Sequence, residues 1–244
     1  GCPSRRMGML FEQRIYTLAS ASADRFWSLQ HERGFELVRP IMERLVGYFS
    51  TRVGSNDVIV HWWRFDSFED WRQRLHGLYE VDALLPYFKQ VRALLSAQEN
   101  KFLTVAPLDA LNPIWSQSSD WLPGLNPFKL GVLTSEVCVE MEILQLRPGT
   151  LPSYWKAWQN IHPDLLKTNQ QRLIGCFYTW VGALHEVTVL RWHPHRQEAQ
   201  DWRSGLENRP DWKAFQAEIA PWVSQTRHHW LQPGPHAQLS PLFA

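Results

Sequence analysis

The chain has 244 residues, of which 44% are hydrophobic and 20% charged, and its formal net charge is +1. This balance is typical of a globular protein and excludes the strongly basic surface that nucleic-acid binding needs. No apolar run approaches the roughly 18 residues of a membrane-spanning helix.

Residues 11–18 alternate between apolar and polar side chains, which predicts a strand. Residues 22–38 carry Phe26, Trp27 and Gln30 at helical spacing behind a Ser cap, and they predict a helix that ends before Pro40. The order continues with strands at 45–53 and 58–65 around a hairpin loop at 54–57, a helix from Phe68, a helix after Pro86 and a strand at 99–105.

A ten-residue segment at 45–54 (LVGYFSTRVG) is nearly copied 128 positions later at 173–182 (LIGCFYTWVG). Each copy is followed by a β-branched run that ends in Trp, and then by an Asp-Trp-Arg triplet, at 70–72 and at 201–203. Self-similarity over a domain-sized interval indicates duplication of a whole folding unit. The second unit is predicted to have strands at 137–146, 172–180, 186–192 and 225–231, and helices at 152–167, 197–206 and 212–223.

Both halves therefore follow the order β-α-β-β-α-β, which is the ferredoxin-like arrangement. The predicted fold class is α+β, with two tandem ferredoxin-like units packed sheet-to-sheet as a pseudo-dimeric α+β barrel, because each sheet has one face without helices. Arg14 aligns with Glu142 of the second unit, and we expect the two to pair. The predicted boundaries are 9–106 and 131–233 for the units, 107–130 for a packed linker that contains Trp115 and Trp121, and 234–244 for a tail.

Short motifs accompany the duplication. In the first half they are Glu-x-Arg-x-Tyr-x-Leu at 12–18, Leu-Val-Gly-Tyr at 45–48 and Val-His-x-Trp-x-x-Asp at 60–66; in the second half they are Arg-Pro-Gly at 147–149, Leu-Ile-Gly at 173–175, Phe-x-Thr at 177–179 and Gly-Ala-Leu at 182–184. Together they resemble the NIPSNAP family over nearly the whole of 11–231. The resemblance implies the dimeric α+β barrel superfamily and, in animals, association with mitochondria, vesicle traffic and mitophagy signalling. Tyr178 and Thr188 stand where relatives tend to carry His, so the second half is expected to have lost part of any polar site.

His61 is the most informative titratable residue, because alternation places it on one strand face with Ile59 and Trp63. A 4-1-3-2 strand order brings polar residues of the first two strands beside it, and a His among carboxylate, phenol and guanidinium groups is a candidate acid or base. The catalytic candidates are His61, Tyr48, Glu12 and Arg14, and the ligand-binding candidates are Trp63, Tyr16, Arg52 and Trp27. The competing interpretation is structural: Glu12, Arg14 and His61 satisfy one another at an interface between two sheets.

The 14 Trp residues suggest aromatic cores, or a cavity between sheet and helices that holds a flat apolar ligand. The predicted function is binding of a protein partner or a small apolar ligand, with no required cofactor and with homo-oligomer formation left open. The alternative is a cofactor-independent enzyme of the monooxygenase or isomerase type, in which His61 is the acid or base, Tyr48 and Arg14 position an oxyanion, and Trp63 stacks on the substrate. The sequence has no GxSxG, P-loop or GxGxxG motif for serine-hydrolase or nucleotide chemistry.

The remaining candidate groups are histidine pairs and cysteines. Pro194 separates His193 from His195, and the adjacent His228 and His229 would point to opposite faces of a strand, so no metal site is predicted. Cys138 and Cys176 fall on strands that are not neighbours, and they are expected to be free core thiols. Three cysteines without a CxxC pair favour a reducing compartment, either cytoplasm or mitochondrial matrix.

Overall fold

The computed structural model of the chain describes residues 9–19, 21–116, 119–122, 130–131 and 133–244. The chain divides into two compact units. The first contains the described residues of Gly1–Phe102, Trp121–Ser135 and Leu231–Ala244, and the second those of Leu103–Asp120 and Glu136–Trp230. The predicted linker is thus shared between both units, and its residues 117–118 and 123–129 lie outside the described residues, as does Cys2. None of the described helices is long and apolar enough to cross a membrane.

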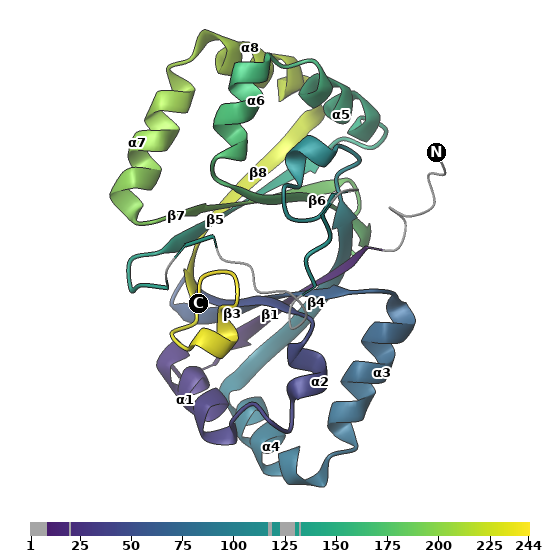
Figure 1. Cartoon of the computed structure of the whole chain (residues 1–244), viewed down its shortest axis with the longest axis vertical. Helices are drawn as coiled ribbons and strands as arrows, with labels where there is room; N and C mark the ends of the chain where they lie inside the picture. The colour runs from purple at the N-terminus through teal and green to yellow at the C-terminus, as the bar shows by residue number, and fades with distance from the viewer. Residues whose placement is uncertain (1–8, 20, 117–118, 123–129, 132) are drawn as a thin grey trace. The chain divides into compact units, whose positions relative to one another are not determined.

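The first unit has the β-α-β-β-α-β order, with its helices on one face of its strands (Figure 1). Its antiparallel sheet has the order β4-β1-β3-β2, as the 4-1-3-2 prediction requires. The strands are β1 (Leu10–Leu18), β2 (Leu45–Val53), β3 (Asn56–Phe65) and β4 (Leu95–Val105). The helices are α1 (Ala23–Arg33), α2 (Arg39–Met42), α3 (Phe68–Tyr79) and α4 (Leu85–Leu94), with a 3-10 turn η2 (Asp82–Leu84) before α4.

The second unit repeats this order, and its sheet runs β8-β5-β7-β6. Its strands are β5 (Cys138–Leu146), β6 (Leu173–Val181), β7 (Glu186–His193) and β8 (Val223–Pro233). Its helices are α5 (Leu151–Gln159), α6 (Pro163–Gln170), α7 (Arg196–Glu207) and α8 (Pro210–Ile219), with 3-10 turns η3 (Asp109–Leu111) and η4 (Ala220–Trp222). The tail adds the 3-10 turn η5 (Ala237–Leu239). The hydrogen-bonded order of all eight strands, β1-β3-β2-β8-β5-β7-β6-β4, is that of a closed antiparallel barrel. The predicted α+β class with two tandem ferredoxin-like units is confirmed.

The two units correspond at a constant spacing of 128 residues, as Leu45 and Leu173 first suggested. Arg14 lies opposite His61 in the β1–β3 pair, and Glu142 lies opposite Val189 in the β5–β7 pair. The helices α3 and α7 also begin and end at corresponding positions. The duplication therefore has the same length throughout these elements, and residues of one unit can be compared directly with those of the other.

The two Asp-Trp-Arg triplets are an exception to this correspondence. Asp70 and Asp201 are 131 positions apart, so the second triplet lies three residues, about one helical turn, further along its helix. The position that corresponds to Asp70 is Glu198, which accepts a hydrogen bond from Arg172 Nη2 at 2.6 Å. The repeated triplet is thus a sequence coincidence within equivalent helices and not an equivalent structural motif.

Three predicted helices are shorter than their periodicity suggests. The first ends at Arg33, because Gly34 takes a φ of 72°. The helix predicted at 152–167 is divided into α5 and α6, and Pro163 starts the second piece. The helix predicted at 212–223 ends at Ile219 and continues as a 3-10 turn that contains Pro221. Each of these helix ends lies at or next to a Gly or Pro, and a prediction from the spacing of apolar residues alone does not take these residues into account.

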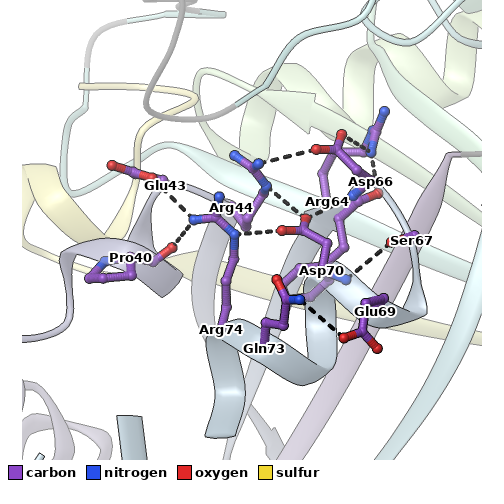
Figure 2. A network of polar contacts seen from close by, with 11 residues as sticks. Pro40, Glu43, Arg44, Arg64, Asp66, Ser67, Glu69, Asp70, Gln73 and Arg74 are labelled. Carbon is purple, nitrogen blue, oxygen red and sulfur yellow. Dashed lines mark hydrogen bonds and ion pairs between the residues drawn. The ribbon is translucent and has the colours of Figure 1, made fainter. Parts of the chain in front are cut away.

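A polar network fixes the first turn of α3 in the first unit (Figure 2). The Asp70 carboxylate accepts hydrogen bonds from Arg44 Nε at 3.0 Å and Arg74 Nε at 2.7 Å, and its N–H donates to the Ser67 hydroxyl at 3.0 Å. Burial alone would raise the pKa of Asp70, but hydrogen bonds from Asp66 N–H and the two arginines lower it. This network holds the helix whose inward face closes one side of the site described next.

The C-terminal tail belongs to the first unit. The N–H of Gly234 donates to the carbonyl of Tyr48 at 2.9 Å, and the Ser240 hydroxyl donates to the carbonyl of Gly234 at 2.7 Å. The ring of His236 stacks on that of His31 in α1 at a centroid distance of 4.8 Å. The tail is therefore anchored beside β2 and α1.

Candidate functional site

A cavity of about 140 Å³ lies between the sheet of the first unit and its helices. Alternate residues of the paired strands share one face, and that face lines the cavity. The sheet contributes Glu12, Arg14, Tyr16, Tyr48, His61 and Trp63. At the outer edge Tyr79 of α3 is 47% exposed and Arg92 of α4 is also exposed, so the cavity reaches the surface between these helices.

His61 is the centre of the polar part of this lining and is only 1% exposed. Its Nδ1 accepts a hydrogen bond from Trp63 Nε1–H at 2.8 Å. The ring of Tyr48 stacks on it at 4.4 Å, and the ring of Tyr16 meets it edge-on at 4.5 Å. The Nε2 atom is buried and has no hydrogen-bond partner within the described structure.

The contact with Trp63 fixes the tautomer of His61. An indole N–H can only donate, so the imidazole nitrogen that faces it must be an acceptor, and in the neutral ring the proton lies on Nε2. Burial and, to a smaller extent, the charge of Arg14 lower the pKa of His61 well below its ordinary value, so the ring stays neutral. The cavity therefore receives an N–H donor, because the lone pair that a base would use is already bonded to Trp63.

Arg14 and Glu12 form a buried ion pair beside His61. Arg14 Nη1 donates to Glu12 Oε2 at 3.1 Å, and its Nε donates to the Tyr16 hydroxyl at 3.1 Å. Burial alone would lower the pKa of Arg14, but Tyr16 and Glu12 raise it, and the guanidinium remains charged. Glu12 Oε2 also accepts from Trp71 Nε1 at 3.1 Å and from Asn100 Nδ2 at 2.8 Å. Its acceptor capacity is therefore largely used within the first unit.

The expected partner of Arg14, Glu142, also has a partner in its own unit. Glu142 Oε1 lies 3.8 Å from Arg191 Nη1, and Arg191 is almost completely buried. The charges of Arg14 and Glu142 are thus both compensated inside their own units.

Besides Tyr79 and Arg92, three polar side chains of the helices line the cavity: Gln30 and Arg33 of α1, and Tyr87 of α4. The Gln30 amide donates to the Tyr87 hydroxyl, and its Oε1 is buried without a partner within the described residues. Arg33 lies 4.7 Å above the Tyr87 ring, and its Nη2 is likewise unpaired. Burial raises the pKa of Tyr87 to about 12, although Arg33 opposes the shift. None of the three was among the site residues predicted from the sequence, where the available signal was a Gln in an otherwise apolar helical stripe.

Six of the eight residues selected from the sequence line this cavity, and Arg52 and Trp27 do not. Arg52 lies near the hairpin end, 3.4 Å from Asp57, and its side chain is 71% exposed. Trp27 is buried but packs edge-on against Tyr48 at 6.3 Å without reaching the cavity. The interpretation of this polar face as an interface between two sheets is wrong, because the helices of the same unit cover it.

The corresponding positions of the second unit form a packed apolar core. Trp158 lies 4.5 Å from the ring of Phe215, where the first unit has the polar pair of Gln30 and Tyr87. Counting 128 positions on, the core contains Tyr154, Trp158, Cys176, Val189 and Phe215 in place of Phe26, Gln30, Tyr48, His61 and Tyr87. Large rings thus fill the part of the volume around the positions of Gln30 and His61, whereas a hollow of about 400 Å³ remains beside α7, lined among others by Glu140, Glu142 and Arg203.

The histidines weighed as metal ligands have other partners in the second unit. His193 is fully buried, with Nδ1 at 3.0 Å from Glu198 and Nε2 at 3.5 Å from Glu140. His195 caps α7 by accepting from Glu198 N–H at 3.1 Å. Burial alone would raise the pKa of Glu140, but His193, His228 and Arg203 lower it strongly. In the part of the chain that the structure describes, no three His, Cys, Asp or Glu residues are grouped to hold a metal ion.

Cys138 and Cys176 are both free and buried, and β7 lies between their strands. Burial raises the pKa of Cys138 to about 11 and that of Cys176 to about 12. Both are therefore protonated core thiols of low reactivity.

Comparison with known proteins places these two units in one family. The NIPSNAP family model matches residues 11–108 and again residues 139–238. The chain belongs to the NIPSNAP family. Each NIPSNAP repeat corresponds to one β-α-β-β-α-β order, so the cavity around His61 lies in the first repeat and the packed core at the corresponding positions lies in the second.

Named relatives and solved structures extend this result. The chain is 26% identical to Protein NipSnap homolog 3A of Homo sapiens over 201 residues, and 23% identical to Protein NipSnap homolog 3B of Mus musculus over 209 residues; each alignment covers 78% of this chain and 70% of the relative. A protein of Fusobacterium nucleatum named "Putative monooxygenase" superposes with a TM-score of 0.60 at 8% identity, covering 93% of this chain and 92% of that chain. A monooxygenase of the same description from Lactobacillus acidophilus gives 0.58 at 9% identity, covering 93% and 94%. At such identities these structures show a shared fold alone.

Proposed function

We propose that this NIPSNAP protein binds a small organic molecule in the cavity of its first repeat, and that the second repeat serves as structural support. The observation that carries the proposal is His61, a buried imidazole in the lining of the cavity whose Nε2 has no hydrogen-bond partner within the described residues. Buried polar groups are normally hydrogen-bonded, so an unpaired one in the lining of a cavity needs an explanation, and a bound ligand supplies one. This observation favours a small ligand over a protein partner, which would meet exposed groups.

A thermal-shift screen of one-ring compounds tests the proposal on the intact chain. Compounds that raise the melting temperature of the wild type should lose this effect in Gln30→Trp. The substitution introduces into the first repeat the side chain of Trp158, which fills the corresponding position of the second repeat. Gln90→Trp, on the exposed side of α4, is the matched control and should respond like the wild type. Gln30→Met, which fills less of the cavity with a flexible side chain, should show an intermediate response if the larger variant folds poorly. Equal shifts in the wild type and both Gln30 variants would contradict binding in this cavity.

The enzyme alternative is retained in one form, because the geometry around His61 supports only one role for it. The neutral imidazole of His61 can stabilise a developing oxyanion through its N–H. It cannot act as a base, because the lone pair that would accept the proton already accepts a hydrogen bond from Trp63. Arg14 would assist as a fixed positive charge beside the Tyr16 hydroxyl. In this form a substrate analogue with an enolate oxygen should bind to the wild type and lose affinity in His61→Phe. The monooxygenase names of the structural neighbours are compatible with such chemistry and give no residue-level support for it.

A further inference from the structure

The cavity of the first repeat carries more positive than negative charge. Arg14, Arg33 and Arg92 line it, and Glu12 is the one carboxylate among its lining residues. Arg14 compensates Glu12 directly, at 3.1 Å, and His61 is neutral. Two guanidinium groups therefore remain without a carboxylate in the lining, and a partly water-excluded site of this kind attracts anions.

The unpaired polar atoms of the lining are mostly hydrogen-bond donors. His61 Nε2–H and Arg33 Nη2 are both buried and have no partner within the described residues. An unpaired buried donor destabilises the protein, and an acceptor oxygen on a ligand would remove that cost. Hydrogen bonds to a charged oxygen are the stronger kind, so an anionic oxygen fits this pair of donors better than a neutral one. The third unpaired atom, Gln30 Oε1, is an acceptor and therefore does not bind the anionic oxygen.

The size and walls of the cavity limit the rest of the ligand. Phe26, Tyr48 and Val91 supply apolar surface around the polar groups. The volume of about 140 Å³ is close to that of an engineered cavity of ~150 Å³ that holds one benzene ring. The part of the ligand that lies inside the cavity is therefore compact, of about one ring.

We propose that the ligand is a compact organic anion, a carboxylate or enolate on an apolar body of about one ring, whose charged oxygen accepts hydrogen bonds from His61 Nε2–H and from a cavity arginine. The inference rests on the proposed binding function and narrows its ligand class. The second repeat cannot bind such a molecule in the same way, because Trp158 and Val189 occupy the positions of Gln30 and His61.

Isothermal titration of the full chain with benzoate, benzamide and benzyl alcohol tests this ligand class, because the three probes share one ring and differ in charge. We expect benzoate to bind the wild type at least about tenfold more tightly than either neutral probe. Arg33→Gln and His61→Phe should each weaken benzoate by about tenfold or more and leave benzyl alcohol within about twofold. His61→Phe keeps a flat ring between Tyr48 and Tyr16 but has no N–H to donate.

Arg25→Gln is the matched control, because Arg25 lies on α1 outside the cavity and pairs at 3.7 Å with Glu32. It should leave the affinities for all three probes unchanged. If Arg25→Gln weakens the binding of benzoate as much as Arg33→Gln does, attraction by general surface charge explains the result and the assignment is wrong.

Equal affinity for benzoate and benzamide would overturn the anionic ligand class while leaving the cavity a binding site. If none of the three probes binds and the one-ring screen is also negative, the proposed function itself fails. Should His61→Phe not fold, Arg33→Gln decides, since Arg33 is only half-buried.

Discussion

The two NIPSNAP repeats place the same backbone positions around the same volume and use that volume differently. In the first repeat Gln30 and Tyr87 form a polar pair at the side of a cavity, and in the second the tilted rings of Trp158 and Phe215 pack against each other at the same positions. Duplication thus allows the same positions to serve aromatic packing in one copy and to carry polar groups in the other. The cavity around His61 is therefore a property of one repeat and not an unavoidable consequence of the fold.

The same contrast appears in the docking of the equivalent helices α3 and α7. None of the described residues of α3 is fully buried, whereas α7 buries Ala199 and Leu206. The α3 helix relies on the arginine–aspartate network at its first turn, centred on Asp70. A helix that spans a cavity has fewer apolar contacts, and polar contacts at its end compensate for part of this loss.

The largest expected effect comes from removing the residue that fills the second repeat. Trp158→Ala should lower the free energy of unfolding by about 3–5 kcal/mol, because it opens a cavity in a packed aromatic core. Gln30→Ala, at the corresponding position of the first repeat, should change it by less than ~1 kcal/mol, since one of the amide's polar atoms is already unpaired. Denaturant unfolding of both variants measures the difference. Similar losses in the two variants would mean that the repeats are packed alike.

A smaller difference is expected at the glycines of the duplicated LVGY and LIGC segments. A Cβ at Gly175 would lie 2.6 Å from the Phe177 ring and 2.9 Å from Asn112 Oδ1, whereas at Gly47 it would meet the Phe49 ring at 2.9 Å. Gly175→Ala should therefore cost about 2–3 kcal/mol, and Gly47→Ala about 1 kcal/mol. Gly205→Ala in α7 meets no atom within 4 Å and should be neutral or stabilising, which makes it the control. The ranking is contradicted if Gly47→Ala proves the more damaging change in thermal unfolding.

His61 should contribute to the pH dependence of the free energy of unfolding. The corresponding residue of the second repeat, Val189, cannot titrate and contributes nothing. The folded-state pKa of His61 lies well below its unfolded value, so the unfolded chain binds the proton more readily. Its contribution is fully present above about pH 6.5 and is lost as the pH falls from there toward the folded pKa, by up to ~1.4 kcal/mol per pH unit. His61→Gln should flatten the stability profile in this window.

His76→Gln, on the exposed face of α3, is the control for this titration and should leave the profile as in the wild type. An imidazole NMR signal of His61 that titrates near pH 6.5 would show that the folded protein does not lower the pKa of this ring, and it would contradict the expected loss of stability.

The sequence predicted the fold well because the duplication supplied two independent versions of each element. It also predicted six of the cavity residues, since strand alternation from His61 fixes which neighbours share its face. It placed Arg52 wrongly in this group, because alternation continues beyond the point where the helices cover the sheet and the hairpin reaches solvent. Gln30, Arg33 and Tyr87 were missed because helical periodicity identifies an inward face but not an empty space beneath it. The comparison of Gln30 with Trp158 was available in the sequence once the spacing of 128 was applied to the helices.

The most direct test of the account is to locate a one-ring anion in the crystal. Crystals soaked with 3-bromobenzoate and measured at the bromine absorption edge should show an anomalous peak among Phe26, Tyr48 and His61, with the carboxylate toward His61 Nε2. No peak should appear among their counterparts Tyr154, Cys176 and Val189. A peak inside the second repeat, or bromine on the protein surface only, would contradict a ligand cavity confined to the first.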